Sequence, residues 1–243
     1  MTTTTLAIVV LGTCCGGFIQ GMSGFAFGLV SMSIWVWSIE PRLAAPMVVW
    51  GSWVGQILSF IAVRRRIDWR RVVPFVLGGA LGVPLGAWLL RYVDVLLFRH
   101  FVGVLLLVYC SIMLAAKHLP AVQRGGRVAD GTVGWIGGLM GGLGGLTGPA
   151  PTLWCTLRGW DKDTQRGIFG VFNLTMHSLT LTSYAIDGTL TVSMMPILAM
   201  MVPVAIVPTF AGGRLYRRFS QEAFRRLVLW VLLGSGIALL VAS

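Results

Sequence analysis

Charged residues are scarce in this chain. Asp, Glu, Lys and Arg make up 11% of its 243 residues, whereas hydrophobic residues make up 56%. A soluble domain of this length needs far more charge to cover its surface. Apolar runs of about twenty residues, the length of a membrane-spanning helix, recur along the sequence. The composition therefore predicts an all-α polytopic membrane protein and argues against a soluble domain.

Carboxylates are especially few. The chain has eight Asp and Glu residues, and they fall in expected loops or at the ends of apolar runs. A transporter of cations or metals usually needs an acidic ligand inside a span, so this class is disfavoured. The four cysteines show no CxxC spacing, and no nucleotide motif or Ser/His/Asp arrangement is present. We expect no enzyme activity, no metal and no cofactor.

Basic residues are the exception to this scarcity. Nineteen Lys and Arg residues give a net charge of +11, and nearly all of them lie in short connections between apolar runs. No basic helix or aromatic stacking platform accompanies them, so we expect no nucleic-acid partner. They instead indicate topology signals and contacts with lipid headgroups.

The sequence contains a weak internal repeat of half its length. A shift of 121 residues aligns "GGFIQGMSGFAFG" (16–28) with "GGLMGGLGGLTGP" (137–149) and superimposes four glycines of each segment. Matching glycines are harder to obtain by chance than matching apolar residues, which favours a duplication. We therefore divide the single integral membrane domain into a first repeat, 1–120, and a second repeat, 121–243.

Each repeat contains three plain apolar spans preceded by a glycine-interrupted segment. The spans are expected at 43–63, 72–90, 99–117, 165–185, 189–211 and 223–242, and the interrupted segments at 5–38 and 132–158. If each interrupted segment enters the membrane and returns as two half-helices of about 10 to 16 residues, six full spans remain. Sixteen of the 19 basic residues then lie on one side, as the positive-inside rule expects.

This pattern predicts two inverted repeats, each with a re-entrant glycine-rich hairpin and three transmembrane helices. Both termini are then outside. The alternative is that the glycine-rich helices cross the membrane intact, held by close small-residue packing, which gives eight spans. In that case the basic residues divide 8 to 11 between the two sides, without a clear bias.

The two hairpin turns are the expected substrate site. Their second half-helices begin near Gly24 and Gly148, where free backbone N–H groups and the positive end of the helix dipole suit an anion. Asn173 and His177 share a helix face, and their repeat partners Ser52 and Gln56 do the same. The candidate substrate-binding residues are Ser23, Gly24, Phe25, Ser52, Gln56, Thr147, Gly148, Asn173 and His177. The polar members could equally make hydrogen bonds between helices. His177 could carry a proton or stay neutral.

Three stretches resemble the sulfite exporter TauE/SafE family of bacterial permeases. They are "GGFIQGMSGFAFGLVSMSI", "GGLMGGLGGLTGPAPTLW" and the end of the first repeat, "GVPLGAWLLRYVD" with "FRHFVGVLLLVYCSIML". The resemblance covers essentially the whole chain. It implies a multi-pass protein of the bacterial inner (cytoplasmic) membrane that moves a small inorganic or organosulfur anion, such as sulfite or a sulfonate.

Export by alternating access is the function we expect for such a chain. A negative cell interior drives an anion outward without a coupling ion, whereas uptake needs one. Two alternatives stay open, namely an uptake permease for a similar anion and a membrane assembly factor without transport. The lipid bilayer is an expected partner, and a homodimer is also open.

Overall fold

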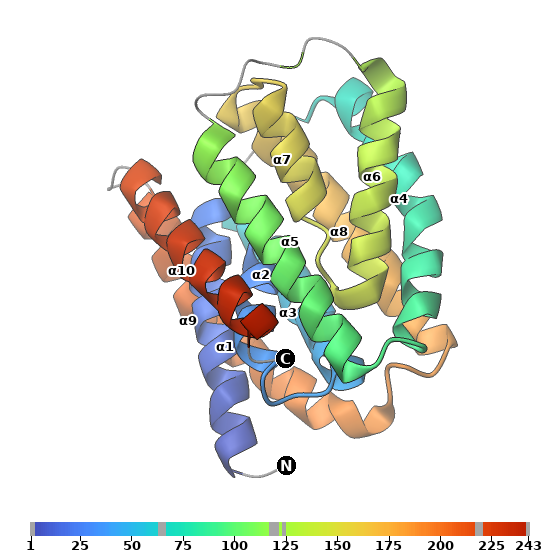
Figure 1. The fold of residues 1–243 in the computed structure, drawn as a ribbon, viewed down its shortest axis with the longest axis vertical. Coiled ribbons are helices and arrows are strands. Elements are labelled where there is room, and N and C mark those ends of the chain that lie inside the picture. The colour runs from blue at the N-terminus through green and yellow to red at the C-terminus, as the bar shows by residue number, and fades with distance from the viewer. Residues whose placement is uncertain (1–2, 63–66, 117–121, 123–124, 217–220, 242–243) are drawn as a thin grey trace.

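The computed structural model describes residues 3–62, 67–116, 122, 125–216 and 221–241, and its regular secondary structure is helical throughout (Figure 1). The first half of the chain contains α1 (Thr3–Ser23), α2 (Phe27–Trp35), α3 (Pro41–Ala62), α4 (Trp69–Leu90) and α5 (Val95–Ala115). The second half contains α6 (Gly126–Gly144), α7 (Pro149–Leu157), α8 (Lys162–Ile186), the 3-10 turn η2 (Val192–Met194), α9 (Met195–Tyr216) and α10 (Gln221–Val241). Both halves therefore have a long helix, a short helix and three long helices in the same order.

Each of the six expected spans overlaps a long helix of the structure. Five helices of the described part are long and apolar enough to cross a membrane: α1, α3, α4, α5 and the stretch 192–215, which includes most of α9. The polytopic all-helical prediction is thus confirmed. Helix α8 is absent from this group because polar residues recur along its length, and it packs against α3, α4, α6 and α7 inside the bundle.

The glycine-interrupted segments break where the sequence predicts, but their limbs are unequal. Helix α1 has 21 residues and α6 has 19, whereas α2 and α7 have nine each. The expected half-helices of 10 to 16 residues are therefore wrong in length. At about 1.5 Å per residue, α1 alone is about 31 Å long, which matches the hydrocarbon thickness of a bilayer. In each pair the short helix contacts the long one, and Figure 1 shows α7 returning alongside α6.

Close packing explains why the glycine-rich first limbs remain helical. A Cβ at Gly138 or Gly142 of α6 would overlap a backbone carbonyl oxygen of α4, that of Gly79 or Val83. On α1, a Cβ at Gly21 would overlap the carbonyl oxygen of Thr209 of α9. These helices approach each other backbone to backbone, as small-residue motifs allow in membranes. The close-packing interpretation is therefore correct for these glycines.

The same helix pairs connect the two halves in both directions. Helix α1, the first of its half, packs on α9, the fourth of the other half, and α6 packs on α4 in the corresponding way. The fifth helices, α5 and α10, pack on each other, and so do the third helices, α3 and α8. Neither half is a separate globule, because the seams between the halves are more extensive than most contacts within them.

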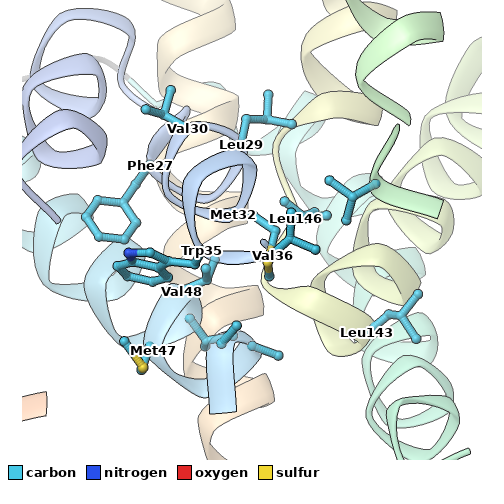
Figure 2. Packing of buried hydrophobic residues seen from close by; sticks show 14 of the residues in the cluster. Phe27, Leu29, Val30, Met32, Trp35, Val36, Met47, Val48, Leu143 and Leu146 are labelled. Carbon is cyan, nitrogen blue, oxygen red and sulfur yellow. The ribbon is translucent and has the colours of Figure 1, made fainter. Parts of the chain in front are cut away.

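The largest apolar cluster surrounds the short helix α2. Eight of its nine residues are buried, among them Phe27, Met32 and Trp35. Figure 2 shows Leu146, which belongs to the connection between α6 and α7, beside Met32 and Val36. Helix α2 is thus enclosed by protein rather than by lipid, and its neighbours include the break of the other half.

Candidate functional site

Two glycines 121 positions apart end the long first helices. Gly24 follows α1 with a φ of 87°, and Gly145 follows α6 with a φ of 70°. Each donates its N–H over 2.7 Å, to the carbonyl of Gln20 and of Gly141 respectively. The left-handed conformation is accessible to glycine and strained for other residues, so these positions stop both helices in the same way.

The two breaks contact each other inside the bundle. A Cβ at Gly148 would lie 2.6 Å from Cδ2 of Phe25, and a Cβ at Gly28 would lie 2.9 Å from the carbonyl oxygen of Gly145. Phe25 also packs on Phe169 of α8, with ring centroids 5.4 Å apart. Two of the candidate residues, Phe25 and Gly148, are thus in contact, and the absence of side chains at these glycines permits it.

Side chains already occupy several backbone donors at the first break. The Ser23 hydroxyl accepts hydrogen bonds from the N–H groups of Phe25 at 3.3 Å and Ala26 at 3.2 Å, and donates to the carbonyl of Ile19 at 2.9 Å. The Gln20 side chain accepts from the N–H of Phe27 at 3.2 Å. These N–H groups are therefore not free for an anion.

The second break offers few donors for a different reason. Helix α7 begins with Pro149 and continues with Pro151, and neither has an N–H. The N–H of Thr152 already bonds the carbonyl of Gly148 at 3.0 Å. The free backbone donors that the sequence predicts are thus few at both breaks, and side chains must supply most of the polar contacts of a site there.

Three of the predicted residues form one buried cluster. The Thr147 hydroxyl donates to Oδ1 of Asn173 at 2.8 Å and lies 3.3 Å from Nε2 of His177. All three side chains are almost fully buried. The second break is thereby connected to α8, on the helix face that carries Asn173 and His177. The polar groups of this cluster hold one another in place.

Ser52 and Gln56 lie on α3, which packs against α8. Trp53 follows Ser52 in α3, and Ser178 follows His177 in α8. Nε1 of Trp53 donates to the Ser178 hydroxyl at 2.9 Å and so joins the two helices. Both Ser52 and Gln56 are buried, with 2% and 1% of their surface exposed. Their side chains make no hydrogen bond to the Thr147 cluster among the interactions described.

Several buried polar atoms in this region have no hydrogen-bond partner in the described part of the chain. They are Ser52 Oγ, Gln56 Nε2, Thr152 Oγ1, His177 Nδ1 and Thr180 Oγ1. An unpaired buried polar group costs about 1–3 kcal/mol, so these five need an explanation. Four of the five lie on α3 and α8.

Four of these atoms belong to a helical pattern of buried polar residues that repeats between the halves. Asn173, His177 and Thr180 are spaced by four and three residues along α8 and therefore share a face. The shift of 121 residues maps them onto Ser52, Gln56 and Ser59 of α3, and all six are buried. The polar stripe is defined here as these six residues.

Sequence reasoning missed four residues of this region. Extending the Asn173 and His177 spacing by one more helical step would have found Thr180 and its partner Ser59. Gln20 gave no signal, because its repeat partner is Gly141 and its role depends on contacts across the fold. Thr152 lies on α7 and also lines a cavity beside the first break, together with the predicted residues Ser23 and Phe25.

Comparisons with known proteins identify the family. The profile described as Sulfite exporter TauE/SafE matches residues 8–239. The chain belongs to this family. It is 30% identical over 240 residues to a protein of Cupriavidus necator described as "Probable sulfite/organosulfonate exporter TauE", covering 94% of this chain and 91% of that protein. No solved structure matches the chain significantly. As a member of the TauE/SafE family with several apolar helices, it is a multi-pass membrane transporter.

Proposed function

We propose that this TauE/SafE member is a permease that exports a small sulfur-containing anion, sulfite or a sulfonate, across the bacterial inner membrane. The observation that supports this most strongly is the set of unpaired polar atoms on the polar stripe. Polar groups inside a membrane protein are costly unless they face one another, water or a ligand. A stripe that recurs on α3 and α8 next to both breaks is suited to a substrate path.

The proposed architecture is a pair of inverted repeats whose α1–α2 and α6–α7 segments are re-entrant. Three observations support it: the reciprocal packing of α1 on α9 and of α6 on α4, the matching positive φ at Gly24 and Gly145, and the contact between the two breaks. In this arrangement the stripe on α3 runs from the centre toward one side and that on α8 toward the other. Together they would reach both faces of the membrane.

Charge supports the orientation of this arrangement. Three basic residues remain on the side proposed as external, and each makes a hydrogen bond or an ion pair within the protein. Arg42 donates to the carbonyl of Arg91 at 2.6 Å, and Arg91 forms an ion pair with Asp187 at 3.2 Å. Arg99 donates to the carbonyls of Val36 and Trp37, both at 3.0 Å, just after α2 ends. The other sixteen basic residues would face the cytoplasm, and both termini would be external.

The mechanism proposed is alternating access around the two breaks. Phe25 lies between Gly148 and Phe169, so movement of one break against the other would displace its ring. Asn173, Thr147, Ser52 and Gln56 then supply neutral donors to the anion. Neutral donors bind an anion without trapping it as strongly as a buried cation would.

Export needs no additional coupling in this scheme. A membrane potential of about 100 mV, negative inside, drives a monovalent anion outward with about 2.3 kcal/mol. Uptake against that potential would need a coupled ion, and the buried residues described include no carboxylate near the stripe. Export is therefore the direction of transport that needs the fewest assumptions.

Flux into proteoliposomes that contain only this protein tests the proposal. We expect saturable flux of sulfite or a small sulfonate, reduced at least tenfold by Asn173→Ala or His177→Ala with folded protein still present. Thr182→Ala is the matched control, because this exposed hydroxyl of α8 only bonds the carbonyl of Ser178 one turn back. Absence of flux for all small sulfur anions would refute the permease and favour an assembly role.

A further inference from the structure

A cavity of about 180 Å³ lies beside the first break, away from the polar stripe. Its walls come from α1, α2, α5, α7, α8 and α10, so residues distant in sequence line it. It is several times larger than the volume of one water in the liquid, about 30 Å³, and smaller than a typical drug-sized pocket. A ligand of a few heavy atoms fits this space.

The lining of the cavity includes polar and positively charged side chains. Among them are Ser23, Thr152, Thr156, Gln165 and Arg166. Arg166 reaches across from α8 and donates to the carbonyl of Met22 at 2.8 Å, which places the guanidinium beside the end of α1. An arginine side chain keeps its charge at any physiological pH. Arg166 is the charged side chain among the described residues that line the cavity, and a positive charge attracts an anion.

Thr152 provides a second and independent indication of a ligand. Its side chain is 3% exposed, its hydroxyl has no partner among the described residues, and it lines this cavity. The other hydroxyl on the same helix face, that of Thr156, already donates to the carbonyl of Thr152 at 2.8 Å. Thr152 can therefore donate to a bound anion that also contacts Arg166.

The rest of the cavity is apolar, which limits the kind of anion. Phe25, Leu29, Phe169, Leu229 and Leu232 contribute to its walls, and all but Phe25 are buried. A fully hydrated inorganic anion gains nothing from such walls and loses water when it enters. An anion with an apolar body gains affinity by placing that body against them.

We propose that this cavity is a binding site for organic anions that carry an apolar body, with the charged head at Arg166 and Thr152 and the body against α5 and α10. It rests on the proposed transport function and specifies its substrate class. Phe25 lines the cavity and also contacts Gly148 of the second break. A bound anion is thus one aromatic side chain away from the Thr147 cluster, and its passage requires Phe25 to move.

Binding to the full-length protein in nanodiscs of zwitterionic lipid tests this site. The probes are inorganic sulfite and the series from methanesulfonate to pentanesulfonate, measured by titration calorimetry. Each added methylene should tighten binding about fourfold until the cavity is filled. Arg166→Gln should weaken all sulfonates at least tenfold, Thr152→Val about fivefold, and Arg166→Lys should keep most of the affinity.

Arg70→Gln is the matched control, because Arg70 is exposed at the start of α4 and lies outside the cavity. The affinities of this variant for the sulfonates should stay within twofold of those of the wild type. The proposal is overturned if affinity does not depend on chain length, if Arg70→Gln weakens binding as much as Arg166→Gln, or if pentanol binds as tightly as pentanesulfonate. The last result would identify the cavity as a groove for lipid chains.

The two proposals fail in different ways. Calorimetry measures binding without transport, so chain-length-dependent binding without flux would overturn the permease and retain the site. Flux without chain-length-dependent binding would overturn the site and retain the permease.

Discussion

The side chain of Gln20 donates to the backbone carbonyl of Ser52 at 3.0 Å, and so fastens α1 to α3 at the level of the first break. Its carbonyl oxygen accepts from the N–H of Phe27, the first residue of α2. Gln20 is 1% exposed. Both ends of this amide are therefore used to hold three helices together.

Gln20→Leu should destabilise the fold. The substitution leaves the Phe27 N–H and the Ser52 carbonyl without this partner in a buried place, which costs about 1–3 kcal/mol for each unsatisfied group. We expect a clearly lower midpoint of thermal unfolding in detergent. An unchanged midpoint would mean that the two backbone groups find other partners.

Gln56→Leu should reduce anion flux without lowering stability. Gln56 is equally buried, but its Nε2 has no partner in the described part of the chain, so removing the amide relieves an unpaired group. The unfolding midpoint should stay the same or rise while anion flux in proteoliposomes falls at least tenfold. Normal flux in this variant would show that the stripe on α3 is not part of the path.

The two glycines that end α1 and α6 offer a matched pair of substitutions. At Gly24 an added Cβ meets no atom within 4 Å, so Gly24→Ala tests only the positive φ and should cost about 1–2 kcal/mol. At Gly145 the Cβ would also lie 2.6 Å from Cγ1 of Val48 and 3.1 Å from the backbone N of Val49. Gly145→Ala should therefore destabilise more than Gly24→Ala in the same unfolding assay. Equal losses of stability would show that the Val48 side chain moves aside at little cost.

The position of the breaks could be predicted from the sequence, but the length of their limbs could not. Gly24 and Gly145 stand out because the repeat aligns them and because Pro149 follows the second. The glycines of α6 look the same in the sequence, yet Gly138 and Gly142 serve close packing against α4 and leave the helix intact. A glycine that turns the chain and one that admits a neighbouring backbone differ only in their partner, and the partner is set by the tertiary fold.

The grouping of three candidate residues was predictable to a similar degree. Spacing and the repeat brought together Thr147, Asn173 and His177, which share hydrogen bonds in the structure. The same reasoning treated Ser23 as a substrate contact, whereas its hydroxyl makes three hydrogen bonds within its own turn. Local hydrogen bonding by serine competes with ligand binding, and the sequence alone does not show which occurs.

Cysteine labelling should place residues 40 and 163 on opposite sides of the membrane. Glu40 is exposed before α3, and Asp163 is exposed in the first turn of α8. In a variant whose four native cysteines are replaced by alanine, a membrane-impermeant maleimide added to whole cells should modify Glu40→Cys and spare Asp163→Cys. Arg70→Cys should behave as Asp163→Cys does. Modification of both 40 and 163 from outside would support eight full spans instead of re-entrant limbs.

Anion flux should follow the membrane potential and not the proton gradient. If a monovalent sulfonate crosses without a coupled ion, a potential of about 100 mV should support a gradient of about fiftyfold at equilibrium. A potassium diffusion potential set with valinomycin provides this force in proteoliposomes, and adding a protonophore should leave the final gradient unchanged when the potential is clamped. His177 is the titratable side chain bonded to the Thr147 hydroxyl, so His177→Gln separates the two mechanisms. A final gradient that depends on pH in the wild type and not in this variant would assign a proton to His177, and with it a coupled route that could also serve uptake.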